Sequence, residues 1–111
     1  MAARTSATAR GAVNVQSWNI LNTDVTGDAA NNPGAPDKTV QVSGTFNSGT
    51  ITMQGSMDSI NWATLHDPSG VALTFTAAGI NTIAENPVYI RPLGSGFAGA
   101  ANVLVQLCAR G

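Results

Sequence analysis

The sequence predicts an all-β protein: a single-domain β-sandwich or jelly roll of about eight short antiparallel strands. Short segments with apolar residues at every second position recur along the chain, and Gly-, Pro-, Asn- and Asp-rich turns separate them. No segment shows a helical period over a useful length. The chain has 111 residues, near the size of one domain. We therefore expect a short N-terminal arm over residues 1–12 and one sandwich domain over residues 13–111.

The strongest alternation flanks the sequence Asn47-Ser48-Gly49. The alternating apolar residues are Val40, Val42 and Phe46 before it, and Ile51, Met53 and Met57 after it. Such patterning on both sides of a Gly-containing turn predicts a β-hairpin. Gly44 and Gly55 fall on the apolar phase and leave room for a large neighbour. Trp62 is the candidate, so we expect it in the core.

The remaining strands follow from the same rules. Val13–Leu21 is expected to be the first strand, and residues 23–37 (TDVTGDAANNPGAPD) a long loop of the kind that is often functional. The segments NWATLH and VALTFT should be strands, separated by Asp67-Pro68-Ser69-Gly70, which has the residues of a type I turn.

Three segments complete the predicted sandwich. Ile80–Ala84 and Val88–Ile90 should be short strands, the second ended by Pro92, which cannot donate a ladder hydrogen bond. A flexible Gly/Ala loop, residues 94–101, carries Phe97. The final segment, NVLVQLCA, is apolar on both faces, so we expect it in the middle of a sheet.

Charged residues are scarce, and this limits the kinds of partner that the chain could bind. Asp, Glu, Lys and Arg make up 10% of the residues, the net charge is −1, and Lys38 is the only lysine. The polar residues are mainly neutral: 12 Thr, 10 Asn, 8 Ser and 4 Gln. No basic stripe exists for nucleic acid. A neutral polar surface packs closely against other copies or partners, although Thr and Asn also simply favour strands and turns.

The termini and the single cysteine suggest no export or membrane anchoring. The first twelve residues hold two arginines but no apolar segment of a signal peptide, and no apolar run could span a membrane. Cys108 cannot form an internal disulfide and should be a small buried hydrophobe. We expect synthesis in a bacterial cytoplasm and no membrane partner.

Catalysis is not expected. His66 stands beside Asp67, which could orient its imidazole, but no nucleophile motif accompanies it, and a turn residue with local hydrogen bonds explains it better. The aspartates of the 23–37 loop lack the spacing of a calcium loop and suit Asx-turns. We expect no enzyme activity, no cofactor and no metal.

Contacts with partners are expected instead at the arm and at two loops. Phe97 is the one aromatic residue expected to be exposed. The residues expected to contact partners are Arg4 and Arg10 of the arm, Asp24, Asp28, Asn31 and Asn32 of the 23–37 loop, and Phe97.

Residues 44–96 (GTFNSGTITMQGSMDSINWATLHDPSGVALTFTAAGINTIAENPVYIRPLGSG), followed by ANVLVQLCAR, resemble small virion proteins of tailed phages. The shared pattern is a hairpin, then G-S-x-D-x-x-x-W-x-x-L, D-P-x-G, T-A-x-G and Y-I-R-P. It covers roughly half to two-thirds of the chain. This resemblance to capsid decoration, or cement, proteins and minor virion components implies a structural role in a phage particle.

A weaker similarity points to discoidin-like jelly-roll domains, which often bind carbohydrate or membrane surfaces. It is carried by Gly55-Ser56, Asp58, Trp62 and Tyr89-Ile90-Arg91. The chain departs from those domains because it is shorter and has no paired cysteines. We interpret the shared residues as framework: Asp58 caps a turn, Trp62 fills the sandwich, and Arg91 pairs near Asp58 or Glu85.

The function expected from the sequence is a cement protein. It would sit on the outside of a phage capsid as a homo-oligomer, a trimer or dimer, and bind the major capsid protein, so that the shell is stabilised. The alternative is a carbohydrate- or receptor-binding module of a phage tail or fibre.

Overall fold

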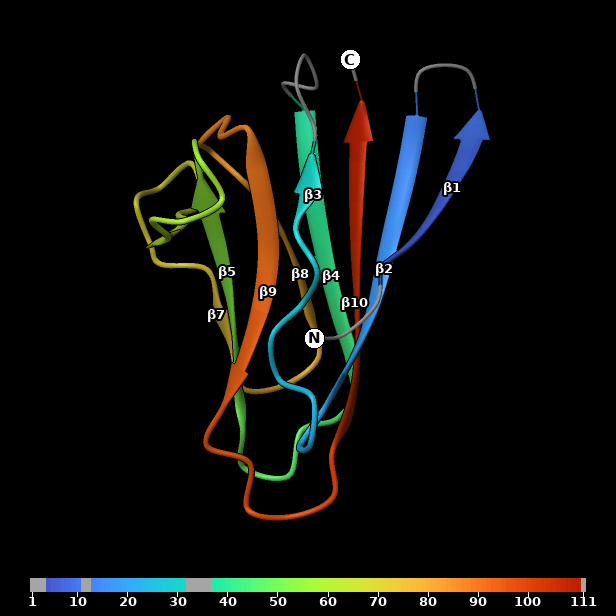
Figure 1. Ribbon diagram of the computed structural model, residues 1–111, viewed down its shortest axis with the longest axis vertical. Helices are drawn as coiled ribbons and strands as arrows, with labels where there is room; N and C mark the ends of the chain where they lie inside the picture. Colours follow the sequence, from blue (N-terminus) through green and yellow to red (C-terminus); the bar gives the residue numbers. More distant parts are fainter. Residues whose placement is uncertain (1–3, 11–12, 32–36, 111) are drawn as a thin grey trace.

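Two antiparallel sheets pack face to face in the computed structural model, which describes residues 4–10, 13–31 and 37–110 (Figure 1). The strands in these residues are β1 (Arg4–Arg10), β2 (Val13–Leu21), β3 (Ala30–Asn31), β4 (Asp37–Thr45), β5 (Thr50–Ser56), β6 (Ala63–Thr64), β7 (Thr74–Phe75), β8 (Gly79–Thr82), β9 (Tyr89–Ser95) and β10 (Asn102–Arg110). The first sheet has the order β1-β2-β10-β4-β8 and the second β3-β9-β5-β6, with β7 also paired to β5. The predicted β-sandwich is confirmed.

The connections between strands give the sandwich a jelly-roll topology. The chain changes sheet at each step from β2 to β5, returns to the first sheet at β8, and changes again at β9 and β10. Without β1, the orders β2-β10-β4-β8 and β3-β9-β5-β6 are the two interleaved sheets of a jelly roll. Strands β6 and β7 share one edge position, because both pair with β5.

The predicted hairpin between β4 and β5 is wrong. Its turn forms, since Gly49 donates a backbone hydrogen bond to Phe46, and both Asn47 and Ser48 have positive φ. The two strands nevertheless separate: β4 pairs with β10 and β8, while β5 pairs with β9, β6 and β7. Alternation requires only that each strand turns its apolar face toward the core. Two strands in opposite sheets meet this requirement as well as two strands of one hairpin do.

The predicted 23–37 loop also contains strand structure. Beyond Leu21 the chain runs along β9: Gly94 donates to Val25, Gly27 donates to Pro92, and β3 pairs with Ile90 and Tyr89. This segment is the edge of the second sheet, although its Gly, Pro and Asn content predicts a loop.

Pro92 does not end β9. The strand runs on to Ser95, and Pro92 lies opposite Met53 of β5. The amide and carbonyl of Met53 bond away from β9, to Leu73 and Leu65, so this pair exchanges no hydrogen bonds. The N–H that Pro92 lacks is therefore not needed by the ladder.

The core is centred on Trp18 and not on Trp62. Trp18 is fully buried, and its indole Nε1 donates to the Asp28 carbonyl at 2.7 Å. Trp62 is half-buried on the outer face of the second sheet. It lies two residues before Thr64 and therefore on the same side of the chain, and Thr64 pairs with Gln54, which points outward. Leu65 and Pro87 fill the space beside Gly55, since a Cβ there would lie 2.6 Å from Leu65 and 2.7 Å from Pro87.

Phe97 closes one end of the sandwich and is not exposed. Its ring is partly buried and packs against the core. A Cβ on Gly49 would overlap this ring, and a Cβ on Gly94 would lie 2.6 Å from it, so these glycines make room for it. Phe97 is therefore less exposed than the sequence predicts, and its role as a contact residue stays a prediction.

Lys38 is buried on the inner face of β4. Its ammonium donates to the Asn86 side chain, and its carbonyl accepts from Ile83, so Lys38 joins β4 to the segment after β8. Burial lowers the pKa of Lys38, and the charge of Asp37 opposes this shift. A lysine so placed is costly to desolvate, and its aliphatic stem and its hydrogen bond offset that cost.

Two further expectations concern the first sheet. The position of β10 between β2 and β4 confirms that the last strand is central. Cys108 is half-buried on the outer phase of β10, so the expectation of a buried thiol is wrong. Residues 4–10 of the expected arm form β1, an edge strand paired with β2; whether the arm docks on a partner stays a prediction.

The different places of the two tryptophans predict different costs of truncation. Trp18→Ala removes a buried ring and its hydrogen bond, so the free energy of unfolding should fall by about 3–5 kcal/mol. Trp62→Ala, on the outer face, should cost less than half as much. Urea unfolding followed by circular dichroism measures both values. Equal costs would contradict the assignment of Trp18, rather than Trp62, to the core.

Candidate binding surface on the second sheet

Large apolar side chains are exposed along the stretch of chain that includes the edge strands β6, β7 and β8. The large exposed hydrophobic residues in the described ranges are Met57, Ile60, Val71 and Ile80, between 60% and 79% exposed. All lie between residues 57 and 80, the stretch that carries the edge strands β6, β7 and β8. We call these four residues the β6–β8 edge. Large exposed apolar side chains are candidates for contacts with a partner.

The two sheets meet at this edge. The hairpin at residues 65–73 reaches across to the segment around β8: Ala84 donates to the His66 carbonyl, and Asn81 Nδ2 donates to Asp67 Oδ2 at 3.3 Å. Within the hairpin, Gly70 donates to the Asp67 carbonyl, which confirms the predicted turn. These bonds join the hairpin that carries Val71 to β8, which carries Ile80 and belongs to the first sheet.

The turn at residues 56–61 holds Met57 and Ile60 in place. The Asp58 carboxylate accepts from the Ser56 hydroxyl and from the backbone amides of Ile60 and Asn61, at 2.8–2.9 Å. Asn61 Nδ2 adds a fourth bond at 2.8 Å. These amides, Asn61 first, hold the pKa of Asp58 well below its ordinary value. The predicted capping role of Asp58 is confirmed.

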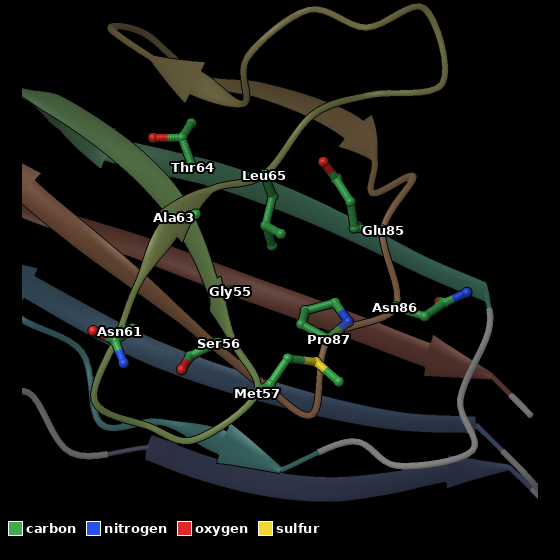
Figure 2. A pocket seen from close by; sticks show the side chains of 10 residues that line it. All are labelled: Gly55, Ser56, Met57, Asn61, Ala63, Thr64, Leu65, Glu85, Asn86 and Pro87. Atoms are coloured by element: carbon green, nitrogen blue, oxygen red, sulfur yellow. The ribbon is translucent and has the colours of Figure 1, made fainter.

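An open pocket of about 410 Å³ lies beside this turn (Figure 2). In Figure 2 the Met57 side chain extends toward Pro87 at the mouth of the pocket. The lining residues are Gly55, Ser56, Met57, Asn61, Ala63, Thr64, Leu65, Glu85, Asn86 and Pro87. The lining is mainly apolar, and it suits an inserted side chain of a partner.

His66 and Glu85 join the hairpin to the segment after β8. Glu85 Oε1 accepts from the His66 amide at 2.8 Å, and Oε2 lies 2.7 Å from His66 Nδ1. Partial burial raises the pKa of Glu85, but the hydrogen bonds from the His66 amide and ring outweigh it, so the pKa lies below its ordinary value. Both side chains are partly exposed. The pair fixes two loops together, and because Glu85 is 19 residues from His66, the expectation that the hydrogen bonds of His66 are local is wrong.

Arg91 lies on the outer face of the second sheet with Trp62 and Gln54. Arg91 Nε donates to Gln54 Oε1 at 2.9 Å, and Arg91 Cζ lies 4.1 Å from the centre of the Trp62 ring. Burial lowers the pKa of Arg91, which still stays charged as arginine does in proteins. The expectation that Arg91 pairs near Asp58 or Glu85 is wrong, because Gln54 and Trp62 are its cross-strand neighbours.

The contact residues predicted from sequence lie elsewhere. Asp28 and Asn31 are exposed on the edge beside β9, and Asp24 is half-buried near Leu21. Asn32 lies outside the described residues, as do the side chains of Arg4 and Arg10. The turn that holds Asp24 lies beside the ends of the loop that carries Phe97, because Gly94 donates to the Val25 carbonyl and the Ala101 amide donates to Asn22 Oδ1.

The described part of the chain shows no cluster of three or more His, Cys, Asp or Glu side chains placed to hold a metal. In the same part, no helix is long and apolar enough to cross a membrane.

The acidic residues of this surface predict how stability depends on pH. The folded-state pKa values of Asp58, Asp67 and Glu85 are lowered, so their contribution is full above the unfolded values near 4 and is lost as the pH falls through the folded values. The melting temperature should stay level from about pH 7 to about pH 5 and fall below about pH 4. Calorimetry across this range measures the change.

Asp58→Ala should lower the melting temperature at neutral pH and make the acid decline shallower. Asp28→Ala is the control, because this exposed residue contributes its carbonyl rather than its carboxylate to the bond with Trp18. If Asp28→Ala flattens the pH profile as much as Asp58→Ala does, the turn network is not the cause.

The comparisons with known proteins show the fold. No protein-family model and no curated protein matches the chain. Among solved structures, it is similar to the SPBc2 prophage-derived protein YomS, with a TM-score of 0.60 and 11% sequence identity. The alignment covers 95% of this chain and 100% of the YomS chain. This chain therefore shares its fold, over nearly its whole length, with a prophage-derived protein.

Proposed function

We propose that the chain is a structural protein of a phage particle that binds the outside of the capsid and stabilises the shell. The observation that carries the proposal is the β6–β8 edge, four large exposed apolar side chains between residues 57 and 80, of which Met57 also lines a pocket. The shared fold with a prophage-derived protein supports a phage origin. The resemblance of residues 44–96 to decoration proteins supports the same assignment.

The geometry of this edge suits assembly. Met57 and Ile60 protrude from a turn that hydrogen bonds hold rigid, so the backbone that carries them loses little conformational freedom on binding. Burying each side chain contributes about 1.5–3 kcal/mol. Many copies on one particle multiply such a modest contact. The proposal includes no enzyme activity, which would need a nucleophile, a general base or a cluster of metal ligands.

The partners proposed are the major capsid protein and further copies of this chain. A protein that binds the mature shell but not its separated subunits stabilises the shell by its binding free energy. A closed dimer or trimer matches the point-group symmetry usual for homo-oligomers. The low overall charge helps, because few ions must be desolvated at such contacts.

Removing the apolar side chains should weaken binding without unfolding the protein. Particles made without this protein are mixed with the purified chain, and its occupancy is measured by sedimentation. Met57→Ser with Ile60→Ser, and Val71→Ser with Ile80→Ser, should each lower the affinity at least about tenfold. Leu104→Ser, on the outer phase of the central strand of the first sheet, is the control and should keep full occupancy.

Shell stabilisation is measured on the same particles. Particles that carry the wild-type chain should release DNA at a higher temperature than bare particles. Particles treated with either double variant should behave like bare ones. Equal release temperatures with and without the wild-type chain would reject the capsid-stabilising role and would favour a glycan- or receptor-binding module instead.

A further inference from the structure

The Arg91 guanidinium is fixed on two sides. Gln54 and Arg91 are direct cross-strand partners of β5 and β9, and the Gln54 carbonyl oxygen accepts from Arg91 Nε. The Trp62 ring covers one face of the guanidinium at 4.1 Å. An arginine held in this way has already lost most of its rotamer freedom, so a ligand that binds it need not restrict it further.

The terminal nitrogens of Arg91 are left without a partner from the described residues. Neither Nη1 nor Nη2 makes a hydrogen bond there, and the ion pair present in those residues is His66 with Glu85. With Nε engaged by Gln54, the edge that remains available is the pair of Nη groups. Two parallel N–H donors of this kind match the two oxygens of a carboxylate.

The residues around Arg91 are those of a protein interface. Tyr89 lies two positions before Arg91 on the same face of β9 and pairs with Ser56, where the turn that carries Met57 and Ile60 begins. Trp, Tyr and Arg dominate the binding energy of protein interfaces, and Met is enriched there. A stacked sugar is less favoured, because Arg91 already occupies one face of the Trp62 ring.

We propose that Arg91 binds a carboxylate of the protein on which the chain docks, with Gln54 and Trp62 as positioning residues and Met57 and Ile60 as the neighbouring apolar contacts. The partner is an acidic side chain or terminal carboxylate flanked by apolar surface. This inference rests on the proposed function, because it names the polar anchor of the same docking surface.

The test uses the full chain and particles that lack it. Arg91→Gln should reduce affinity for the particles at least about tenfold, because it removes a charged hydrogen-bonding partner. Arg91→Lys should lose nearly as much, since an ammonium cannot make the paired bonds of a guanidinium. Gln106→Glu, on the outer phase of β10 in the first sheet, changes the net charge by the same amount and should bind as the wild type does. Melting temperatures confirm that every variant is folded.

A second measurement tests the ligand chemistry without particles. The indole N–H of Trp62 and the Nε–H of Arg91 are followed by NMR while glutarate is added, with glutaramide as the uncharged control. Glutarate should shift both signals, glutaramide should not, and Arg91→Gln should abolish the shift of the indole signal. Glucuronate and glucose are added in parallel.

The outcomes separate the two proposals. If the wild type binds particles and Arg91→Gln binds equally well, this inference is overturned and the proposed function stands. If the wild type does not bind particles, the proposed function fails; a glutarate shift lost in Arg91→Gln then still supports the carboxylate site. The carboxylate site is overturned if glucose shifts the signals as much as glucuronate does, or if glutarate causes no shift.

Discussion

The burial of one apolar face of each sheet against the other is the constraint on which the rest of the structure depends. Alternate residues of β4, β5, β9 and β10 point inward, and the residues between them are left for the two outer faces. At the centre, Trp18 must satisfy an indole N–H in a region without water. It bonds to the Asp28 carbonyl and so fixes the crossing from β2 to β3. This bond adds to the backbone bonds to β9 that hold a segment rich in loop-forming residues.

The same constraint explains why the β6–β8 edge is open to partners. The strand opposite β5 at this edge is interrupted: β6 and β7 have two residues each, and the hairpin at residues 65–73 stands between them. A short, broken edge strand resists edge-to-edge pairing with other sheets. It also frees the 56–61 turn and the hairpin from the core, so their apolar side chains can face outward while Leu65 and Leu73 anchor the hairpin inside.

The sequence predicts where strands lie better than it predicts their partners. Period-2 alternation identified β4, β5 and β10, and central placement followed for β10 because both its faces are apolar. Alternation does not say which sheet a strand joins, so the hairpin between β4 and β5 was wrong. Pro92 shows a related limit. A proline is excluded from a strand only at a position whose backbone N–H must donate to the neighbouring strand. Whether position 92 must donate depends on its pairing with Met53, in a strand nearly forty residues away.

The candidate site was harder to predict, because its parts are separated in sequence and joined by register. Alternation around Tyr89-Ile90-Arg91 could place Arg91 on an outer face. It could not show that Gln54, 37 residues earlier, lies opposite, or that Trp62 covers the guanidinium. Trp62 was expected inside because Gly44 and Gly55 fall on the apolar phase of their strands and leave room for a large neighbour. Its phase relative to Thr64 turns it outward instead, and that phase is fixed only once β6 pairs with β5.

The atoms that hold the 56–61 turn together differ from the side chains proposed to bind. Asp58 and the Ser56 hydroxyl bond to the backbone of residues 58–61, and none of these bonds uses the Met57 or Ile60 side chains. Gln54 and Trp62 hold Arg91 by its Nε and one ring face, and its outer edge stays available. Contact residues can therefore vary with the partner while the framework stays intact. The preorganisation of this surface follows from hydrogen bonds that the fold already needs in order to close its turns.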